Sequence, residues 1–321
     1  MFEYLFLGTS ASAPSAHRGL PAHILMHREY RFLIDCGEGT QRQILRSGVG
    51  FKRLERILIT HGHLDHILGL GGLISTLSRW ETLNKLEIYA GSWALKRIED
   101  LIYRVVLRNT SSDLPIQLIP IEPGTLFEDS KFRITAFSVR HRGPDCFGFS
   151  FEEKARRPFL QEKAVALDLP EGPIRRDLVE GSEVTLEDGR IIRPDDVLGE
   201  SIPGTKLIHV GDCGDTSGLD KYVEGADALI IEATYLEEDH EMALRYGHLT
   251  AERAARLAQQ SGVKQLILTH LSRRNREKLI LEEARAVHPN TAVARDLDHY
   301  TIRRQHEAIL ARRNHVSNKR S

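Results

Sequence analysis

Cysteine and long apolar runs are scarce in this sequence of 321 residues. Its three cysteines, Cys36, Cys146 and Cys213, are too few and too scattered for a disulfide framework or a paired-cysteine metal site. The uncharged stretch 67–78 is too short and too rich in glycine to span a bilayer. The acidic Glu3 within a short apolar segment predicts a first strand rather than a signal peptide. We therefore expect a soluble protein of the reducing cytoplasm, with no part in a membrane.

A surplus of positive charge is also absent. Lys and Arg together number 44 and Asp and Glu 45, so the formal net charge is −1. This excludes a cationic coat over the whole surface, although a local basic patch stays possible. Charged residues make up 28% of the chain and hydrophobic residues 41%, which is typical of a globular protein and excludes general disorder.

Short apolar or β-branched runs alternate with segments of helical spacing, a pattern typical of an α/β fold. Strands are predicted at 4–7, 31–34, 56–60, 86–89, 132–139, 206–210, 228–231 and 265–269. Helices are predicted at 38–46, 70–79, 93–107, 250–260 and 277–287. Gly48 and Gly262 stand where a helix C-terminus favours glycine. No linker rich in Pro, Gly or Ser interrupts the pattern, so residues 1–321 are predicted to form one domain.

The segment 152–193 breaks this alternation. It is charged and punctuated by proline, with one short helical stretch at 160–167 and a hairpin pattern around Asp188 and Gly189. Such a segment adds little to a hydrophobic core. We expect a flexible arm inserted into the domain.

Four potential metal ligands occur within six residues after the strand at 56–60: His61, His63, Asp65 and His66. So many imidazole and carboxylate groups in one loop would be costly to bury without a cation. In an extended segment, His61 and His63 point to the same side, while Asp65 and His66 turn toward a second position. One loop can therefore serve two ions.

Two ions need more ligands than this loop supplies. His141, Asp212 and His270 each stand directly after an apolar strand, at the edge where α/β sheets gather their active sites. Taken singly, each of these residues could be an ordinary cap or turn residue. Together with the loop they form a predicted metal site.

These motifs resemble the metallo-β-lactamase superfamily and, within it, the ribonuclease Z family of endonucleases that trim tRNA 3′ ends. The similarity extends over nearly the whole chain. It rests on 5–9 (LFLGT), 35–41 (DCGEGTQ), the loop 61–66 (HGHLDH), 211–212 (GD), 232–235 (EATY), 247–250 (GHLT) and 266–272 (LILTHLS). Departures at Cys213, Ile231, Leu249 and Asn275 remove none of the predicted ligands.

The resemblance implies a four-layer αββα sandwich with an inserted exosite arm and two Zn²⁺ per subunit. His61, His63 and His141 would hold the first ion, Asp65, His66 and His270 the second, and Asp212 would bridge them. The same donor set accepts Mn²⁺ or Fe²⁺, so the choice of metal stays open.

The chemistry implied is hydrolysis of precursor tRNA on the 3′ side of the discriminator nucleotide. The tRNA would keep a 3′-hydroxyl and the trailer a 5′-phosphate. Asp65 would orient or deprotonate the attacking water, and His248, held by Glu232, would protonate the leaving oxygen. Without the resemblance, Glu232 and His248 are equally well read as a strand-end carboxylate and a helix-entry histidine.

Three residues are predicted to contact substrate. Gly172 and Pro173 stand in a Pro-x-Gly-Pro-like element that the resemblance assigns to a tRNA-gripping arm. Arg274 would contact phosphate, because a guanidinium group matches phosphate oxygens, although a solvated arginine is the alternative. A homodimer in which each arm serves the partner's active site is implied by the resemblance alone.

Two other functions stay open. A hydrolase of the same fold would act on small phosphodiesters, sulfate esters or lactones, but such substrates gain nothing from a protruding arm. A non-catalytic RNA-binding protein would keep the fold for structure alone, but an unneutralised ligand cluster is then hard to explain.

Overall fold

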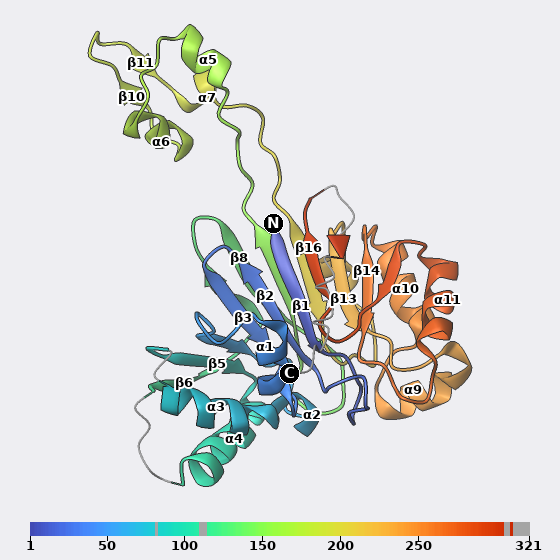
Figure 1. Ribbon diagram of the computed structural model, residues 1–321. Coiled ribbons are helices and arrows are strands. Elements are labelled where there is room, and N and C mark those ends of the chain that lie inside the picture. The colour runs from blue at the N-terminus through green and yellow to red at the C-terminus, as the bar shows by residue number, and fades with distance from the viewer. Residues whose placement is uncertain (81–82, 109–113, 305–308, 311–321) are drawn as a thin grey trace, which may run out of the picture. The chain divides into compact units, whose positions relative to one another are not determined.

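Two mixed β-sheets contain most of the strands in the computed structural model (Figure 1). The structure describes residues 1–80, 83–108, 114–304 and 309–310. The chain divides into two compact units, Met1–Glu152 with Thr205–Ser321, and Glu153–Gly204. Both large sheets belong to the first of these units. No helix in the described part of the chain is long and apolar enough to cross a bilayer.

The first sheet has eight strands within the described residues, and its two halves differ in direction. Strands from β17 to β3 pair antiparallel, whereas β3 to β6 pair parallel. Their order is β17 (Ile309–Leu310), β16 (His299–Ile302), β1 (Phe2–Gly8), β2 (Ala22–His27), β3 (Tyr30–Ile34), β4 (Arg56–Leu58), β5 (Leu86–Ala90) and β6 (Ile116–Pro120).

The second sheet has seven strands in the part of the chain that the structure describes. Their order is β15 (Thr291–Val293), β14 (Leu266–Thr269), β13 (Ala228–Glu232), β12 (Lys206–Val210), β9 (Phe147–Glu153), β8 (Phe132–Ser138) and β7 (Gly124–Glu128). Strands β12 to β15 pair parallel. Their carboxyl ends therefore meet at one edge, where the candidate site lies.

Successive side chains of a strand point to opposite faces of its sheet, and this alternation explains how the two sheets pack. On β1, Tyr4 and Phe6 join the core between the sheets, while Leu5 and Leu7 point to the opposite face. Phe149 and Phe151 enter the same inter-sheet core from β9. Burying each of these large side chains stabilises the fold by about 2 kcal/mol.

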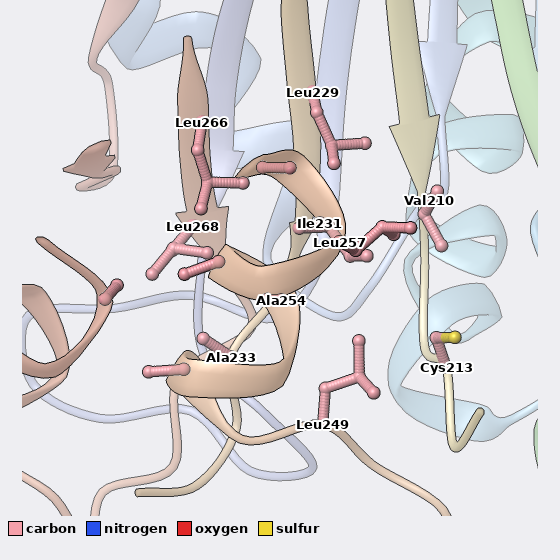
Figure 2. Close-up of a cluster of buried hydrophobic side chains, with 14 of the residues drawn as sticks. Val210, Cys213, Leu229, Ile231, Ala233, Leu249, Ala254, Leu257, Leu266 and Leu268 are labelled. Atoms are coloured by element: carbon pink, nitrogen blue, oxygen red, sulfur yellow. The ribbon is translucent and has the colours of Figure 1, made fainter. Parts of the chain in front are cut away.

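Helices cover the outer face of each sheet. The first is covered by α1 (Thr40–Ser47), α2 (Leu64–Ile67), α3 (Gly69–Trp80) and α4 (Ser92–Glu99), and the second by α8 (Asp220–Val223), α10 (Ala251–Gln260) and α11 (Glu277–Val287). Figure 2 shows Ala254 and Leu257 of α10 against strands β13 and β14. The predicted four-layer αββα sandwich is confirmed.

The predicted strands and helices are present, but the sequence pattern did not reveal all elements. The strand β2 was missed because its buried face includes His23 and His27, which interrupt an apolar pattern. The predicted helix 93–107 divides into α4 and the π-helix η1 (Asp100–Val106).

The smaller unit, Glu153–Gly204, has a core of its own. It contains α5 (Gln161–Ala166), α6 (Pro173–Val179), β10 (Val184–Thr185), β11 (Ile191–Ile192) and α7 (Pro194–Val197). Ala164, Leu178 and Val197 from its three helices pack together. Arg175 donates to the carbonyl oxygens of Leu169 and Pro170 at 2.7 and 2.9 Å, which holds the turn before α6.

Candidate metal centre

A buried carboxylate, Asp35, holds the histidine-rich loop that links β4 to α2. The backbone N–H of Thr60 donates to Asp35 Oδ1 and the Thr60 hydroxyl to Oδ2, both at 2.8 Å. His66 Nδ1 lies 2.8 Å from the same Oδ2. No role was predicted for Asp35, although it directly follows an apolar strand and opens the motif 35–41.

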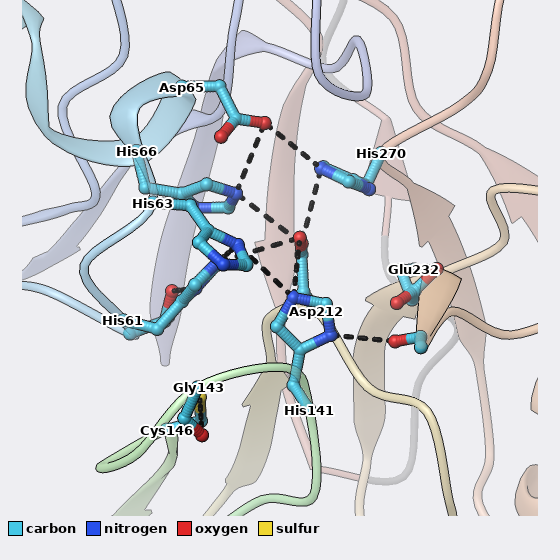
Figure 3. Close-up of polar contacts among 12 residues, drawn as sticks. His61, His63, Asp65, His66, His141, Gly143, Cys146, Asp212, Glu232 and His270 are labelled. Carbon is cyan, nitrogen blue, oxygen red and sulfur yellow. Dashed lines mark hydrogen bonds and ion pairs between the residues drawn. The ribbon is translucent and has the colours of Figure 1, made fainter. Parts of the chain in front are cut away.

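The first group of predicted ligands comes together around His61, His63, His141 and Asp212 (Figure 3). His63 Nδ1 lies 2.9 Å from His61 Nε2 and 3.3 Å from His141 Nε2. Asp212 Oδ2 faces this group, 3.6 Å from His61 Nε2 and 3.7 Å from His141 Nε2.

The second group contains Asp65, His66 and His270. Asp65 Oδ2 lies 3.7 Å from His66 Nε2 and 3.8 Å from His270 Nε2. The other oxygen of Asp212, Oδ1, is 3.4 Å from His66 Nε2 and 3.2 Å from His270 Nε2. The two oxygens of Asp212 therefore face different groups of ligands.

The donor atoms of the second group fit a divalent cation. His66 Nε2, His270 Nε2 and Asp212 Oδ1 are buried, and none has a well-formed hydrogen bond to another described residue. A buried polar atom left in this state costs about 1–3 kcal/mol. Imidazole nitrogens and carboxylate oxygens are the ligands that zinc and similar ions prefer. The seven residues therefore form a candidate metal-binding site.

Hydrogen bonds to the far nitrogens orient four of the imidazoles. In each ring Nδ1 has a partner on the protein, so Nε2 points toward the other ligands. The Nδ1 partners are Thr60 Oγ1 for His61 at 3.0 Å, Asp35 Oδ2 for His66 at 2.8 Å, the Gly247 carbonyl for His141 at 2.6 Å and Thr234 Oγ1 for His270 at 3.0 Å. Thr234 and Gly247 belong to the motifs 232–235 and 247–250, which by themselves predicted no role for either residue.

The protonation states of most of the ligands suit metal binding. Burial lowers the pKa of His63 to about 4 and holds that of His61 well below its usual value. Burial alone would raise the pKa of Asp65, but His66 and His270 lower it below its usual range. His66 is the exception. Although burial opposes it, Asp212 and Asp35 hold the pKa of His66 above its usual value, so a proton there competes with a cation.

Glu232 and His248 form a buried pair beside the ligands. His248 Nδ1 lies 2.9 Å from Glu232 Oε1, which also accepts the backbone N–H of Cys213 at 2.7 Å. Burial would lower the pKa of His248, but the Glu232 carboxylate raises it to about 9. His248 is therefore protonated at neutral pH, with its Nε2 left for a further partner.

An open cavity of about 260 Å³ adjoins these groups. Besides predicted residues, it is lined by four for which no site role was predicted, Ser12, Arg142, Tyr235 and Tyr246. The backbone N–H of Ser12 donates to Asp65 Oδ2 at 3.1 Å. The sequence offered a weak signal for three of them, since Ser12 lies in the small-residue loop after β1, Tyr235 ends the motif 232–235 and Tyr246 directly precedes the motif 247–250.

The three predicted substrate-binding residues belong to two different units of the chain. Arg274 follows β14 on an exposed turn, where its Nε lies 3.2 Å from Asp239 Oδ2, and it does not line the cavity. Gly172 and Pro173 belong to the smaller unit, where Pro173 begins α6 and Gly172 adopts a φ of 127°.

Two facing sheets with outer helices, together with a His and Asp cluster at their strand ends, define a metallo-β-lactamase-fold hydrolase. Residues 172–271 match the family model described as Beta-lactamase superfamily domain, and residues 2–157 match the one described as Anti-Pycsar protein Apyc1. The chain belongs to the ribonuclease Z family, as the resemblance predicted.

Three relatives carry this assignment. Ribonuclease Z of Bradyrhizobium sp. (strain ORS 278) is 47% identical over 305 residues, which cover 94% of this chain and 100% of that protein. Ribonuclease Z of Methanothermobacter thermautotrophicus is 40% identical, over 92% of this chain and 95% of the relative. The crystal structure of human tRNase Z, short form, superposes with a TM-score of 0.66 and 26% identity, covering 94% of this chain and 99% of that one.

Proposed function

We propose that this protein is a zinc-dependent endoribonuclease that removes 3′ trailers from precursor tRNA. It would cut on the 3′ side of the discriminator nucleotide, leaving a 3′-hydroxyl on the tRNA and a 5′-phosphate on the trailer. The observation that carries this proposal is the 47% identity to a ribonuclease Z along that relative's whole length. The site supports it with a full set of imidazole and carboxylate groups.

Two zinc ions per subunit are proposed. His61, His63 and His141 would hold one ion and Asp65, His66 and His270 the other, with Asp212 between them. The division of the Asp212 oxygens between the two groups supports this assignment. When bound, the ions would bring the pKa of a water toward neutrality and stabilise charge on the phosphoryl oxygens.

The protein's own groups would move the protons. The Asp65 carboxylate, oriented by the Ser12 N–H, accepts the proton of the attacking water. As the bond between phosphorus and O3′ breaks, His248 Nε2 donates a proton to O3′. Glu232 holds His248 through Nδ1 and keeps it protonated.

Substrate binding would involve residues outside the cavity. We propose that residues 152–193 serve as an exosite arm within a single domain of 1–321, with Gly172 and Pro173 contacting the tRNA and Arg274 contacting phosphate. We also propose that the enzyme works in the cytoplasm as a homodimer, each arm serving the partner's site. Light scattering on the purified protein would test the dimer.

Single-turnover cleavage of a precursor tRNA with a short trailer tests the function. The wild type would be compared with Asp65→Ala and with a deletion of 154–203. The ends of this deletion are close, because a Cβ on Gly204 would lie 2.0 Å from the Glu153 carbonyl oxygen.

The proposal requires three results. The wild type cuts after the discriminator, Asp65→Ala is inactive, and the deletion weakens tRNA binding while bis(4-nitrophenyl) phosphate is still hydrolysed. A wild type that leaves tRNA intact but hydrolyses the small ester would make the substrate a small phosphodiester. If Asp65→Ala kept both the tRNA cleavage and the hydrolysis of the small ester, Asp65 would not be a catalytic residue.

A further inference from the structure

Two tyrosines line the cavity beside the candidate metal site, Tyr235 and Tyr246. Tyr235 is half-buried, and Tyr246 is 40% exposed. Neither phenolic hydroxyl hydrogen-bonds to another side chain or backbone group in the described part of the chain. The two rings are thus not held there by polar contacts of their own, and both face a space that ends at the predicted ligands.

The backbone fixes both tyrosines relative to His248. Tyr246 is the last residue of α9 (His240–Tyr246), and Gly247, with a φ of 72°, turns the chain directly into His248. The N–H of Tyr235 donates to the Leu249 carbonyl at 3.2 Å, and the N–H of Ala251 to the Tyr235 carbonyl at 2.9 Å. The Tyr235 and His248 ring centroids lie 6.2 Å apart. The general-acid candidate and the two aromatic rings therefore form one wall of the cavity.

This wall lies on the leaving-group side of the proposed reaction. Glu232 occupies Nδ1 of His248, so Nε2 is the nitrogen that can donate to O3′. The nucleotide that carries this oxygen, on the 5′ side of the cut, must then lie against His248. The base of that nucleotide would then lie beside Tyr235 and Tyr246, which line the same cavity.

The chemistry of the wall suits a nucleobase. Arg245 lies over the Tyr246 ring, 5.6 Å from its centroid, and can cover only one face of the ring. Arg142, which also lines the cavity, supplies positive charge beside it. Stacking on an aromatic ring accepts any of the four bases, because each has a π-face. A partly exposed tyrosine in a polar cavity is poorly explained as core packing.

We propose that Tyr235 and Tyr246 form a stacking subsite for the base of the nucleotide whose O3′ leaves. This inference rests on the proposed ribonuclease function. It assigns the binding of the discriminator base to Tyr235 and Tyr246. The subsite binds one unpaired base by stacking and does not read its identity.

Two substrates and a double variant test the subsite. Cleavage of a precursor tRNA is compared with that of the same RNA lacking the base at the discriminator position, for wild type and for Tyr235→Leu with Tyr246→Leu. Removing the base should lower wild-type kcat/KM about tenfold. The double variant should lose a similar factor on the intact RNA and little more on the abasic RNA.

Trp80→Leu is the matched control, since Trp80 is a 54% exposed aromatic residue on α3 that does not line the cavity. It should respond to the abasic RNA as the wild type does. Metal content and Tm establish that the variants fold. Should the double variant fail to fold, Tyr246→Leu, at an exposed position, replaces it in the comparison of the two RNAs. Tyr235→Phe keeps an aromatic ring and should cleave both RNAs as the wild type does.

Equal losses for wild type and double variant on removing the base would overturn the subsite and leave the ribonuclease function intact. A wild type that cuts neither RNA would instead overturn the proposed function, and with it the subsite.

Discussion

The Nδ1 atom of His141 lies 2.6 Å from the carbonyl oxygen of Gly247. This contact joins a strand-end histidine to the turn that also carries Tyr246 and His248. Gly247 ends helix α9 with a φ of 72°. A Cβ there would lie 2.8 Å from Arg142 Cγ and 3.4 Å from His141 Nδ1. The turn therefore needs glycine for both conformation and space.

Gly247→Ala should weaken metal binding about tenfold, because the displaced carbonyl no longer orients the His141 imidazole. Competition with a chelator measures this affinity. Gly225→Ala is the matched control, since Gly225 has a φ of 63° but a Cβ added there would meet nothing within 4 Å. Equal metal affinity in the two variants would show that the contact between Gly247 and His141 does not contribute to metal binding.

Asp35→Asn should also weaken metal binding about tenfold while keeping the shape of the side chain. The change removes the negative charge next to His66 and one acceptor from the Thr60 and His66 contacts. Zinc content after dialysis against a weak chelator is the measurement. Retention of zinc at the wild-type level would mean that Asp35 only stabilises the fold.

His248→Asn and Glu232→Gln should each slow RNA cleavage, by about 100-fold or more for His248→Asn, because the leaving O3′ then lacks its proton donor. Bis(4-nitrophenyl) phosphate separates this role from a structural one. Its nitrophenolate leaves without a proton, so both variants should hydrolyse it at close to the wild-type rate. A parallel loss on both substrates would argue against a general acid.

Acid should destabilise the fold through His209, which is buried between the sheets next to the Tyr4 hydroxyl at 2.8 Å. Burial lowers its pKa to about 4, whereas the unfolded chain titrates at about 6.5. Between these values the unfolded state binds more protons, so stability falls as pH falls from about 6.5 to 4. This one residue accounts for a loss of about 3 kcal/mol.

Urea unfolding of the chelator-treated protein across this range measures the effect. His209→Gln, which does not titrate, should show a shallower dependence on pH than the wild type. Parallel curves for the two proteins would assign the acid sensitivity to other groups.

Metal removal should abolish cleavage and lower the Tm, since buried Asp212 Oδ1, His66 Nε2 and His270 Nε2 then lose their compensating partner. Zinc at 1,000 times its Kd would stabilise the folded state by about 4 kcal/mol. Calorimetry with and without zinc tests this, with Asp212→Asn as the comparison. An equal zinc-dependent rise in Tm for Asp212→Asn would place the stabilising ion elsewhere.

Much of the candidate site was predictable because its residues obey local rules. The crowded loop of His61, His63, Asp65 and His66 is chemically improbable without a cation, whatever fold surrounds it. His141, Asp212 and His270 each follow an apolar strand, and parallel strands end at a common edge. The structure brings all seven residues together.

The residues that were missed act through contacts between distant segments. Asp35 lies 31 positions before His66, and Gly247 lies 106 positions after His141. An aspartate after a strand and a glycine after a helix are common in any α/β protein, so neither stands out in a sequence. Arg175 of the smaller unit likewise donates to the backbone carbonyls of Leu169 and Pro170, a local role that its residue type does not reveal.

The α/β class and the presence of a metal site could be read from the sequence alone, because strand periodicity and ligand density are local properties, whereas the four-layer sandwich came from the family resemblance. The folded chain was needed to show how the oxygens of Asp212 divide between two groups of ligands, which partner orients each imidazole, and which aromatic rings stand beside His248. Those relationships depend on how the two sheets pack against each other, and the packing is set by the inter-sheet core around Tyr4 and Phe149, far from the motifs themselves.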